Sequence, residues 1–203
     1  GGTRGRFRIT YNGEIYNFRR LREALVDEGV NFVTQSDTEV LLRLYERDGA
    51  AMVKKLRGMF ALAIWDEAER QLFLARDPFG IKPLYYADDG RTLRLASQVK
   101  ALLAGGHAGN SGPDAAGHAG FFLFGSVPDP HTLYADIHAL PAGHTLTIQA
   151  DGSRHEQRYF NPVQILKDAE AAKPVSDELP LREMLLDSVR HHFVADVPVG
   201  VFL

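Results

Sequence analysis

Four short runs of apolar and β-prone residues in the middle of the chain most restrict what it can fold into. They cover residues 59–65, 71–75, 84–87 and 93–97, and turn-forming segments at 66–69, 77–80 and 88–90 separate them. Short strands joined by tight turns are typical of antiparallel sheets. The pattern predicts an antiparallel meander across residues 59–97.

The residues before this region are predicted to form one strand and several helices. Residues 7–11 alternate between apolar and polar side chains and lead into Asn12-Gly13, which predicts a strand running into a tight turn. Residues 18–28 have helical spacing, with Asn17 as the expected N-cap. A second helix is indicated by the Ser-x-x-Glu capping box that begins at Ser36. A short helix is expected over residues 51–56.

The C-terminal part of the chain has its own organisation. Short helices are expected over 98–104 and 114–124, and a hairpin is expected at 144–159 around Asp151-Gly152. Residues 161–176 carry two prolines, several charges and no clear period, which indicates an interdomain connection. An amphipathic helix through residues 181–193 follows, and residues 199–203 resemble the first buried strand of a second domain.

Composition excludes several classes of protein. The 203 residues include 23 basic and 26 acidic side chains, a formal net charge of −3, so no basic surface points to nucleic acid or to an anionic membrane. The longest apolar runs are far shorter than the roughly 20 residues of a membrane-spanning helix. The chain has no cysteine, so it holds no disulfide, zinc-thiolate site or thiol nucleophile of its own.

Two clusters of polar residues could carry chemistry. The first surrounds Asn12, Gly13 and Glu14, and the second surrounds Asp37. An Asn amide beside a Gly backbone N–H is a suitable pair of donors for a developing oxyanion, and carboxylates such as Glu14 and Asp37 could accept hydrogen bonds from an ammonium group. The residues alone equally allow a structural interpretation, in which the first cluster is a turn and the second a helix cap.

Two further features allow alternative interpretations. Lys82 follows the Asp77-Pro78-Phe79-Gly80 turn and could contact a phosphate or form an ion pair with Asp77. His191 and His192 are adjacent, so they cannot share one face of a helix. We therefore expect a solvated or interdomain helix there rather than a metal site, and we expect no metal ligands in this chain.

Six motifs together strongly resemble the glutamine-hydrolysing asparagine synthetases. They occur in family order over almost the whole chain: Asn-Gly-Glu-Ile-Tyr-Asn at 12–17, Ser-Asp-Thr-Glu-Val-Leu-Leu at 36–42, Leu-Arg-Gly-Met-Phe-Ala at 56–61, Ala-Arg-Asp-Pro-Phe-Gly-Ile-Lys-Pro-Leu-Tyr-Tyr at 75–86, Leu-Pro-Ala-Gly-His at 140–144 and Asp-Val-Pro-Val-Gly-Val-Phe-Leu at 196–203.

This resemblance implies an α+β fold of the N-terminal-nucleophile hydrolase type, an αββα sandwich of antiparallel sheets. It implies a class II glutamine amidotransferase domain over residues 1–160, a linker over 161–176, and the first helix and strand of an α/β ATP-pyrophosphatase domain over 177–203. Asn12 and Gly13 match the family's oxyanion hole. Asn12, Gly13, Glu14 and Asp37 match residues that hold glutamine, and Leu203 matches a position in the ATP pocket.

The implied reaction needs groups that this chain lacks. In the family a cysteine at the mature amino terminus attacks the glutamine amide, and the released ammonia converts aspartate to asparagine in a second site that uses ATP and Mg²⁺. We therefore expect an inactive fragment of a cytoplasmic parent enzyme, which could form a homodimer. Two alternatives stay open: a paralogue that amidates another carboxylate, and a catalytically dead interaction module.

Overall fold

The computed structural model describes residues 5–106, 112–172, 181–193 and 200. The strands in this part of the chain are β1 (Phe7–Ile15), β2 (Gly58–Asp66), β3 (Gln71–Arg76), β4 (Tyr85–Asp88), β5 (Leu93–Ala96), β6 (Ile137–Ala139), β7 (His144–Gln149) and β8 (Arg154–Arg158). The helices are α1 (Phe18–Asp27), α2 (Asp37–Asp48), the 3₁₀ helix η1 (Gly49–Lys55), α3 (Val99–Ala104), α4 (Ala115–Phe124), α5 (Pro162–Ala171) and α6 (Leu181–His192).

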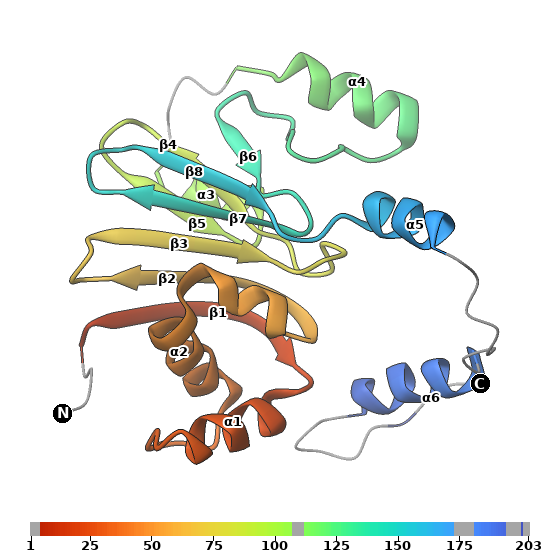
Figure 1. The fold of residues 1–203 in the computed structure, drawn as a ribbon. Coiled ribbons are helices and arrows are strands. Elements are labelled where there is room, and N and C mark those ends of the chain that lie inside the picture. Colours follow the sequence, from red (N-terminus) through yellow and green to blue (C-terminus); the bar gives the residue numbers. More distant parts are fainter. Residues whose placement is uncertain (1–4, 107–111, 173–180, 194–199, 201–203) are drawn as a thin grey trace.

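Two antiparallel sheets form the centre of the fold (Figure 1). The larger has the strand order β1-β2-β3-β7-β8, and the smaller has the order β5-β4-β6. Helices α1 and α2 cover one face of the larger sheet, and an apolar cluster lies between the two sheets. Helix α3 packs on the far side of the smaller sheet through Leu102. The predicted α+β class with antiparallel sheets is therefore confirmed.

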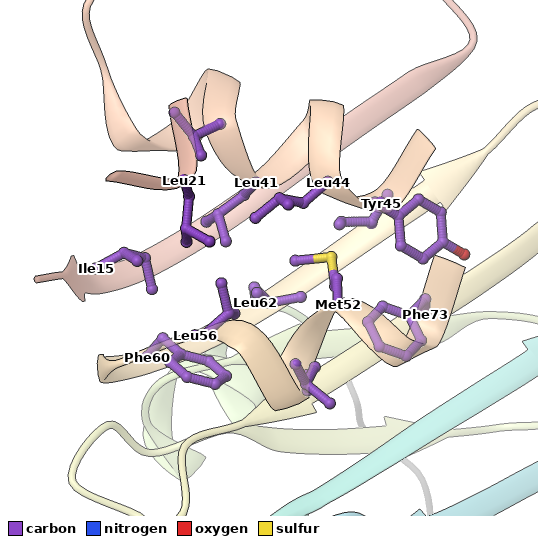
Figure 2. Close-up of a cluster of buried hydrophobic side chains, with 14 of the residues drawn as sticks. Ile15, Leu21, Leu41, Leu44, Tyr45, Met52, Leu56, Phe60, Leu62 and Phe73 are labelled. Atoms are coloured by element: carbon purple, nitrogen blue, oxygen red, sulfur yellow. The ribbon is translucent and has the colours of Figure 1, made fainter. Parts of the chain in front are cut away.

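The largest apolar cluster lies between the larger sheet and its helices. Figure 2 shows side chains of α2 and η1, among them Leu41, Leu44 and Met52, directed at Phe60 and Phe73 of the sheet. All five are fully buried. Burial of a large apolar side chain contributes about 2 kcal/mol, so this cluster fixes α2 against the sheet.

The prediction of a single meander was wrong. β2 pairs with β3, and β4 pairs with β5, but β3 and β4 belong to different sheets. The chain changes layers at Asp77, whose fully buried carboxylate accepts hydrogen bonds from one backbone N–H of β2 and from three in the turn that follows it. Strand β6, which the sequence analysis missed, occupies the other side of β4. Local patterns cannot distinguish two sheets from one, because both give the same alternation.

The prediction of a turn at Asn12-Gly13 was also wrong. β1 continues to Ile15, with Gly13 opposite Phe60 of β2. Gly13 has a φ of +153°, and a Cβ there would overlap the carbonyl oxygen of Met59. Gly58 has a φ of +155°, and a Cβ there would overlap the carbonyl oxygen of Glu14. The glycines permit two strands to approach closely rather than reversing the chain.

The predicted helices are present, with differences at their caps. Ser36 caps α2 as expected and accepts a hydrogen bond of 3.3 Å from the N–H of Glu39. In a capping box the Glu39 carboxylate would accept the N–H of Ser36, but here it accepts the N–H groups of Val33 and Thr34. Asn17 occupies the N-cap position of α1, but its side chain does not cap the helix. Its amide NH₂ group donates to the carbonyl of Lys55, and its amide oxygen accepts the N–H of Arg57.

The C-terminal part agrees with the sequence in outline. The hairpin is β7 and β8, and the amphipathic helix is α6. Residues 161–176 contain α5, which Asn161 caps and Pro162 begins. The expected strand at 199–203 lies outside the described residues apart from Gly200, and so does Leu203. The linker and domain boundaries stay predictions.

Candidate functional site

The strand β1 presents one edge that no described strand covers. The N–H of Tyr16 points toward β2, because it donates to the carbonyl of Arg57, and the N–H of Ile15 points the other way, to Asp37. Successive N–H groups of a strand alternate in direction. The N–H of Gly13 therefore points to the open edge, the same side as the N–H of Ile15.

Asp37 lies at this same edge. It is the first residue of α2, and its Oδ2 accepts hydrogen bonds from the Tyr11 hydroxyl at 2.9 Å and from the Ile15 N–H at 3.3 Å. Residues two apart on a strand are separated by roughly 7 Å. The Asp37 carboxylate is therefore the next polar group along the edge from the Gly13 N–H.

The electrostatics around Asp37 favour a carboxylate with a fixed orientation. Burial, followed by the charge of Asp37 and the hydrogen bond to it, raises the pKa of Tyr11 well above its ordinary value. The phenol therefore stays protonated at neutral pH and remains a donor to Asp37. The N-terminus of α2 also stabilises a negative charge at this position.

Asn12 and Glu14 occupy a different face of β1. Their side chains alternate with those of Tyr11 and Ile15, which face the helices. Asn12 lines a hollow of about 120 Å³ between the sheets, together with Thr10, Ala61, Ala63, Pro83 and Ser97 among others. The structure thus brings Asp37 and the Gly13 N–H to one edge and places Asn12 and Glu14 on the inner face. A ligand that contacts both sets has to lie where this edge and face meet.

Tyr11 is a residue that sequence reasoning missed. Its role depends on a hydrogen bond to a residue 26 positions away, and no local pattern signals such a contact. Asp77 was expected to be part of a turn, which is confirmed, and was also a possible ion-pair partner of Lys82. Its carboxylate binds the backbone N–H of Lys82 at 2.9 Å, and this contact is not the predicted ion pair with the Lys82 ammonium group.

The two histidines of α6 lie beside Tyr16. The ring centroids of His192 and Tyr16 are 4.9 Å apart, and His191 Nδ1 lies 2.7 Å from the backbone carbonyl oxygen of Asp187. In the described part of the chain, no group of three or more His, Cys, Asp or Glu side chains could hold a metal ion.

Comparison with known proteins assigns the family. Residues 2–160 match the family model described as a glutamine amidotransferase domain. The chain belongs to this glutamine amidotransferase family. Asparagine synthetase [glutamine-hydrolyzing] 1 of Bacillus subtilis is 41% identical over 96% of the chain, and a putative asparagine synthetase of Mycobacterium tuberculosis is 37% identical over 98%. The chain spans only 30% and 31% of the length of these two relatives.

Solved structures support the fold of this amidotransferase domain. The glutamine phosphoribosylpyrophosphate amidotransferase of Bacillus subtilis superposes on 78% of the chain, and the chain covers 30% of it, with a TM-score of 0.54 and 24% identity. At this identity the match shows a shared fold alone. No helix in the described part of the chain is long and apolar enough to cross a membrane.

Proposed function

We propose that this domain binds and hydrolyses glutamine as part of a glutamine-dependent asparagine synthetase. One observation carries the proposal: the Gly13 N–H and the Asp37 carboxylate lie along the same open edge of β1. A donor for an oxyanion and an acceptor for an ammonium group are what the two ends of a glutamine substrate require. Membership of the amidotransferase family and the similarity to named asparagine synthetases support it.

The proposed chemistry divides between this chain and residues outside it. The chain has no cysteine, so the nucleophilic thiolate has to come from a segment that precedes it in the parent protein. The thiolate attacks the amide carbon of glutamine, and the oxyanion that forms accepts hydrogen bonds from the Gly13 N–H and the Asn12 amide. The amide nitrogen is protonated and leaves as ammonia. Water then hydrolyses the thioester to glutamate and frees the thiol.

The remaining site residues bind the amino-acid end of glutamine. In this proposal the carboxylates of Asp37 and Glu14 accept hydrogen bonds from the α-ammonium group. Tyr11 holds the Asp37 carboxylate in place through its hydrogen bond of 2.9 Å. The substrate lies where the edge and inner face of β1 meet, which lets Glu14 and Asp37 approach it from different sides.

The synthetase half of the parent supplies the second reaction. There ATP, with Mg²⁺, would convert the side-chain carboxylate of aspartate to an acyl adenylate and release pyrophosphate. Ammonia would then displace AMP from the adenylate to give asparagine. Leu203 is the proposed contribution of this chain to the ATP pocket. Among the described residues no cluster of three or more His, Cys, Asp or Glu side chains could hold Mg²⁺, so its ligands would come from the synthetase half. We further propose a cytoplasmic parent that forms a homodimer.

The parent protein could alternatively transfer ammonia to a carboxylate other than that of aspartate. Amidase chry2 of Gibberella zeae is 32% identical over 98% of the chain, although its name is not that of an asparagine synthetase. The same glutaminase domain could therefore serve a paralogue that amidates another carboxylate. Incubating the full-length parent with ATP, glutamine and either aspartate or other carboxylates, and measuring pyrophosphate, distinguishes the two acceptors.

Glutamate release by the full-length parent tests the glutaminase proposal. Removing one oxyanion donor typically lowers kcat by 10²–10³-fold, and we expect Asn12→Ala to lose about this much. Asn31→Ala, at an exposed position between α1 and α2, is the matched control. The 203-residue chain alone should release no glutamate. A parent without any glutaminase activity would instead favour the catalytically dead module.

A further inference from the structure

Helix α4 packs with its small residues inward. Its only buried residues are Gly117 and Gly120. A Cβ on Gly117 would overlap the carbonyl oxygen of Thr132, and a Cβ on Gly120 would overlap the ring of Pro128. The backbone of α4 therefore lies directly against the segment 128–132, and this contact leaves no room for a side chain.

The large apolar residues of α4 point outward instead. Phe122, Leu123 and Phe124 are 82%, 75% and 71% exposed, and Phe121 is 48% exposed. Helix α4 contains no Asp, Glu, Lys or Arg. A helix on a solvent-facing surface normally directs its apolar stripe at the core and its charged residues at water. Helix α4 has the reverse arrangement, which is typical of a surface that another protein element covers.

The orientation of α4 is fixed at both ends. The Asp114 carboxylate caps its first turn through a hydrogen bond to the Gly117 N–H, and it also lies 3.4 Å from His131 Nδ1. Gly125 ends the helix in the left-handed conformation, and its N–H donates to the Phe121 carbonyl at 2.9 Å. The outward aromatic residues are therefore a preformed surface.

The exposed apolar residues of the chain are distributed toward its C-terminal part. Among the described residues, eighteen large apolar side chains are exposed, and fourteen of them come after residue 120, on α4, α5, α6 and at Leu133 and Phe193. Figure 1 shows these three helices along one side of the fold. The relatives continue far beyond this chain, which spans 30% of the Bacillus subtilis enzyme. A domain that follows α6 would begin on this side.

We propose that the outward face of α4, residues 121–124, is a docking surface for the synthetase half of the same polypeptide. The occupant is the part of the parent chain that follows Leu203. Three observations support this occupant over a second copy: the apolar exposure extends along the path by which the chain leaves the amidotransferase domain, α5 repeats it with Val163, Ile165 and Leu166, and the relatives have the necessary length. Helix α4 then contacts its partner by aromatic residues that need no rearrangement.

Hydroxyl-radical footprinting of two proteins tests this proposal without any activity assay. The 203-residue chain and the full-length parent are oxidised side by side, and modification of residues 121–124 is compared by mass spectrometry. We expect a severalfold lower modification in the full-length parent at a concentration where it is monomeric. Phe79, which is 72% exposed, and Val26, on α1, provide reference positions within the same samples.

Substitutions on α4, together with the protein concentration, then distinguish the synthetase half of the same chain from a second copy as the element that covers this surface. In the full-length parent, the double change Phe122→Ser and Phe124→Ser should restore modification of the neighbouring Leu123, and Val26→Ser should not. Equal modification of 121–124 in both proteins overturns the proposal. Protection that appears only when the concentration is raised to form dimers also overturns it, in favour of a second copy. Because the readout is exposure, loss of the proposed glutaminase function would not affect the result.

Discussion

The Tyr11 hydroxyl donates a hydrogen bond of 2.9 Å to the Asp37 carboxylate, and this contact joins the strand β1 to the first turn of α2. The same carboxylate oxygen accepts the Ile15 N–H. Asp37 is thereby held along the open edge of β1 by groups on either side of Gly13. The position of the candidate site depends on this pair rather than on either segment alone.

We expect Tyr11→Phe to weaken glutamine binding more than it slows turnover. Phe keeps the ring that packs beneath α2 but removes the donor that orients Asp37. Loss of such a hydrogen bond costs about 1 kcal/mol, which corresponds to an increase in KM for glutamine of about fivefold. Steady-state glutaminase kinetics of the full-length parent measure this.

Tyr159→Phe is the matched control for this change. The Tyr159 hydroxyl donates at 2.7 Å to the carbonyl of Arg76, away from Asp37. The Tyr159→Phe substitution removes a comparable phenol hydrogen bond and should leave the KM for glutamine unchanged. An equal increase in KM for both variants would show that the effect on binding does not pass through Asp37.

Gly13→Ala should destabilise the fold strongly. A Cβ at Gly13 would overlap the carbonyl oxygen of Met59, so β1 and β2 would have to separate where the site lies. We expect a loss of about 3 kcal/mol in the free energy of unfolding, measured by urea denaturation of the 203-residue chain. Gly90→Ala is the control, because Gly90 has a φ of +80° in open space, and it should cost only about 1 kcal/mol. Similar losses for both would mean that strand proximity is unimportant.

Asp77→Asn should also destabilise the chain. Each carboxylate oxygen of this buried residue accepts two backbone N–H groups: Oδ1 binds Phe79 and Ile81, and Oδ2 binds Phe60 and Lys82. An amide would direct its own NH₂ group at two of these donors and leave them without an acceptor. The expected cost is about 2–3 kcal/mol in thermal or urea unfolding.

The control for Asp77 is Asp151→Asn in the exposed β7–β8 turn. Asp151 Oδ1 also accepts a backbone N–H, that of Ser153, but water can replace this contact. We expect a change below about 0.5 kcal/mol there. If Asp77→Asn is as mild as Asp151→Asn, the buried turn is not what holds the two sheets together.

The stability of the chain should fall in acid partly through Asp66. Arg6 donates two hydrogen bonds of 2.9 Å to this carboxylate, which is 4% exposed, and they hold the pKa of Asp66 below its ordinary value. A depressed pKa in the folded state stabilises the protein above the ordinary value of 3.8. This contribution is lost as the pH falls from there through the lowered pKa of the folded state.

Urea denaturation at a series of pH values between about 5 and 2 measures this loss. In Asp66→Asn the free energy of unfolding should be lower at pH 5 and should depend less steeply on pH. Asp27→Asn, at an exposed carboxylate of α1, should keep the original slope. An unchanged slope in Asp66→Asn would contradict the assignment.

Local patterns were sufficient where the physical cause is itself local. The Ser36 N-cap and the hairpin at Asp151-Gly152 depend on residues within a few positions of one another, and both are present in the structure. The candidate residues Asn12, Gly13, Glu14 and Asp37 came from the motifs that resemble the family. Their assigned roles stay predictions, although the family itself is confirmed.

Tertiary structure decided what depends on distant partners. The sequence determined that short antiparallel strands and amphipathic helices would form, because alternation and helical spacing are properties of neighbouring residues. It could not determine that Gly13 lies within a strand, since the glycine is required there by the close approach of the Met59 backbone on β2. Nor could it determine that Asp37 reaches the edge of β1 through Tyr11, or that the aromatic residues of α4 face outward over buried glycines. Those outcomes depend on which surfaces the fold brings within contact, and contact between distant segments leaves no local pattern.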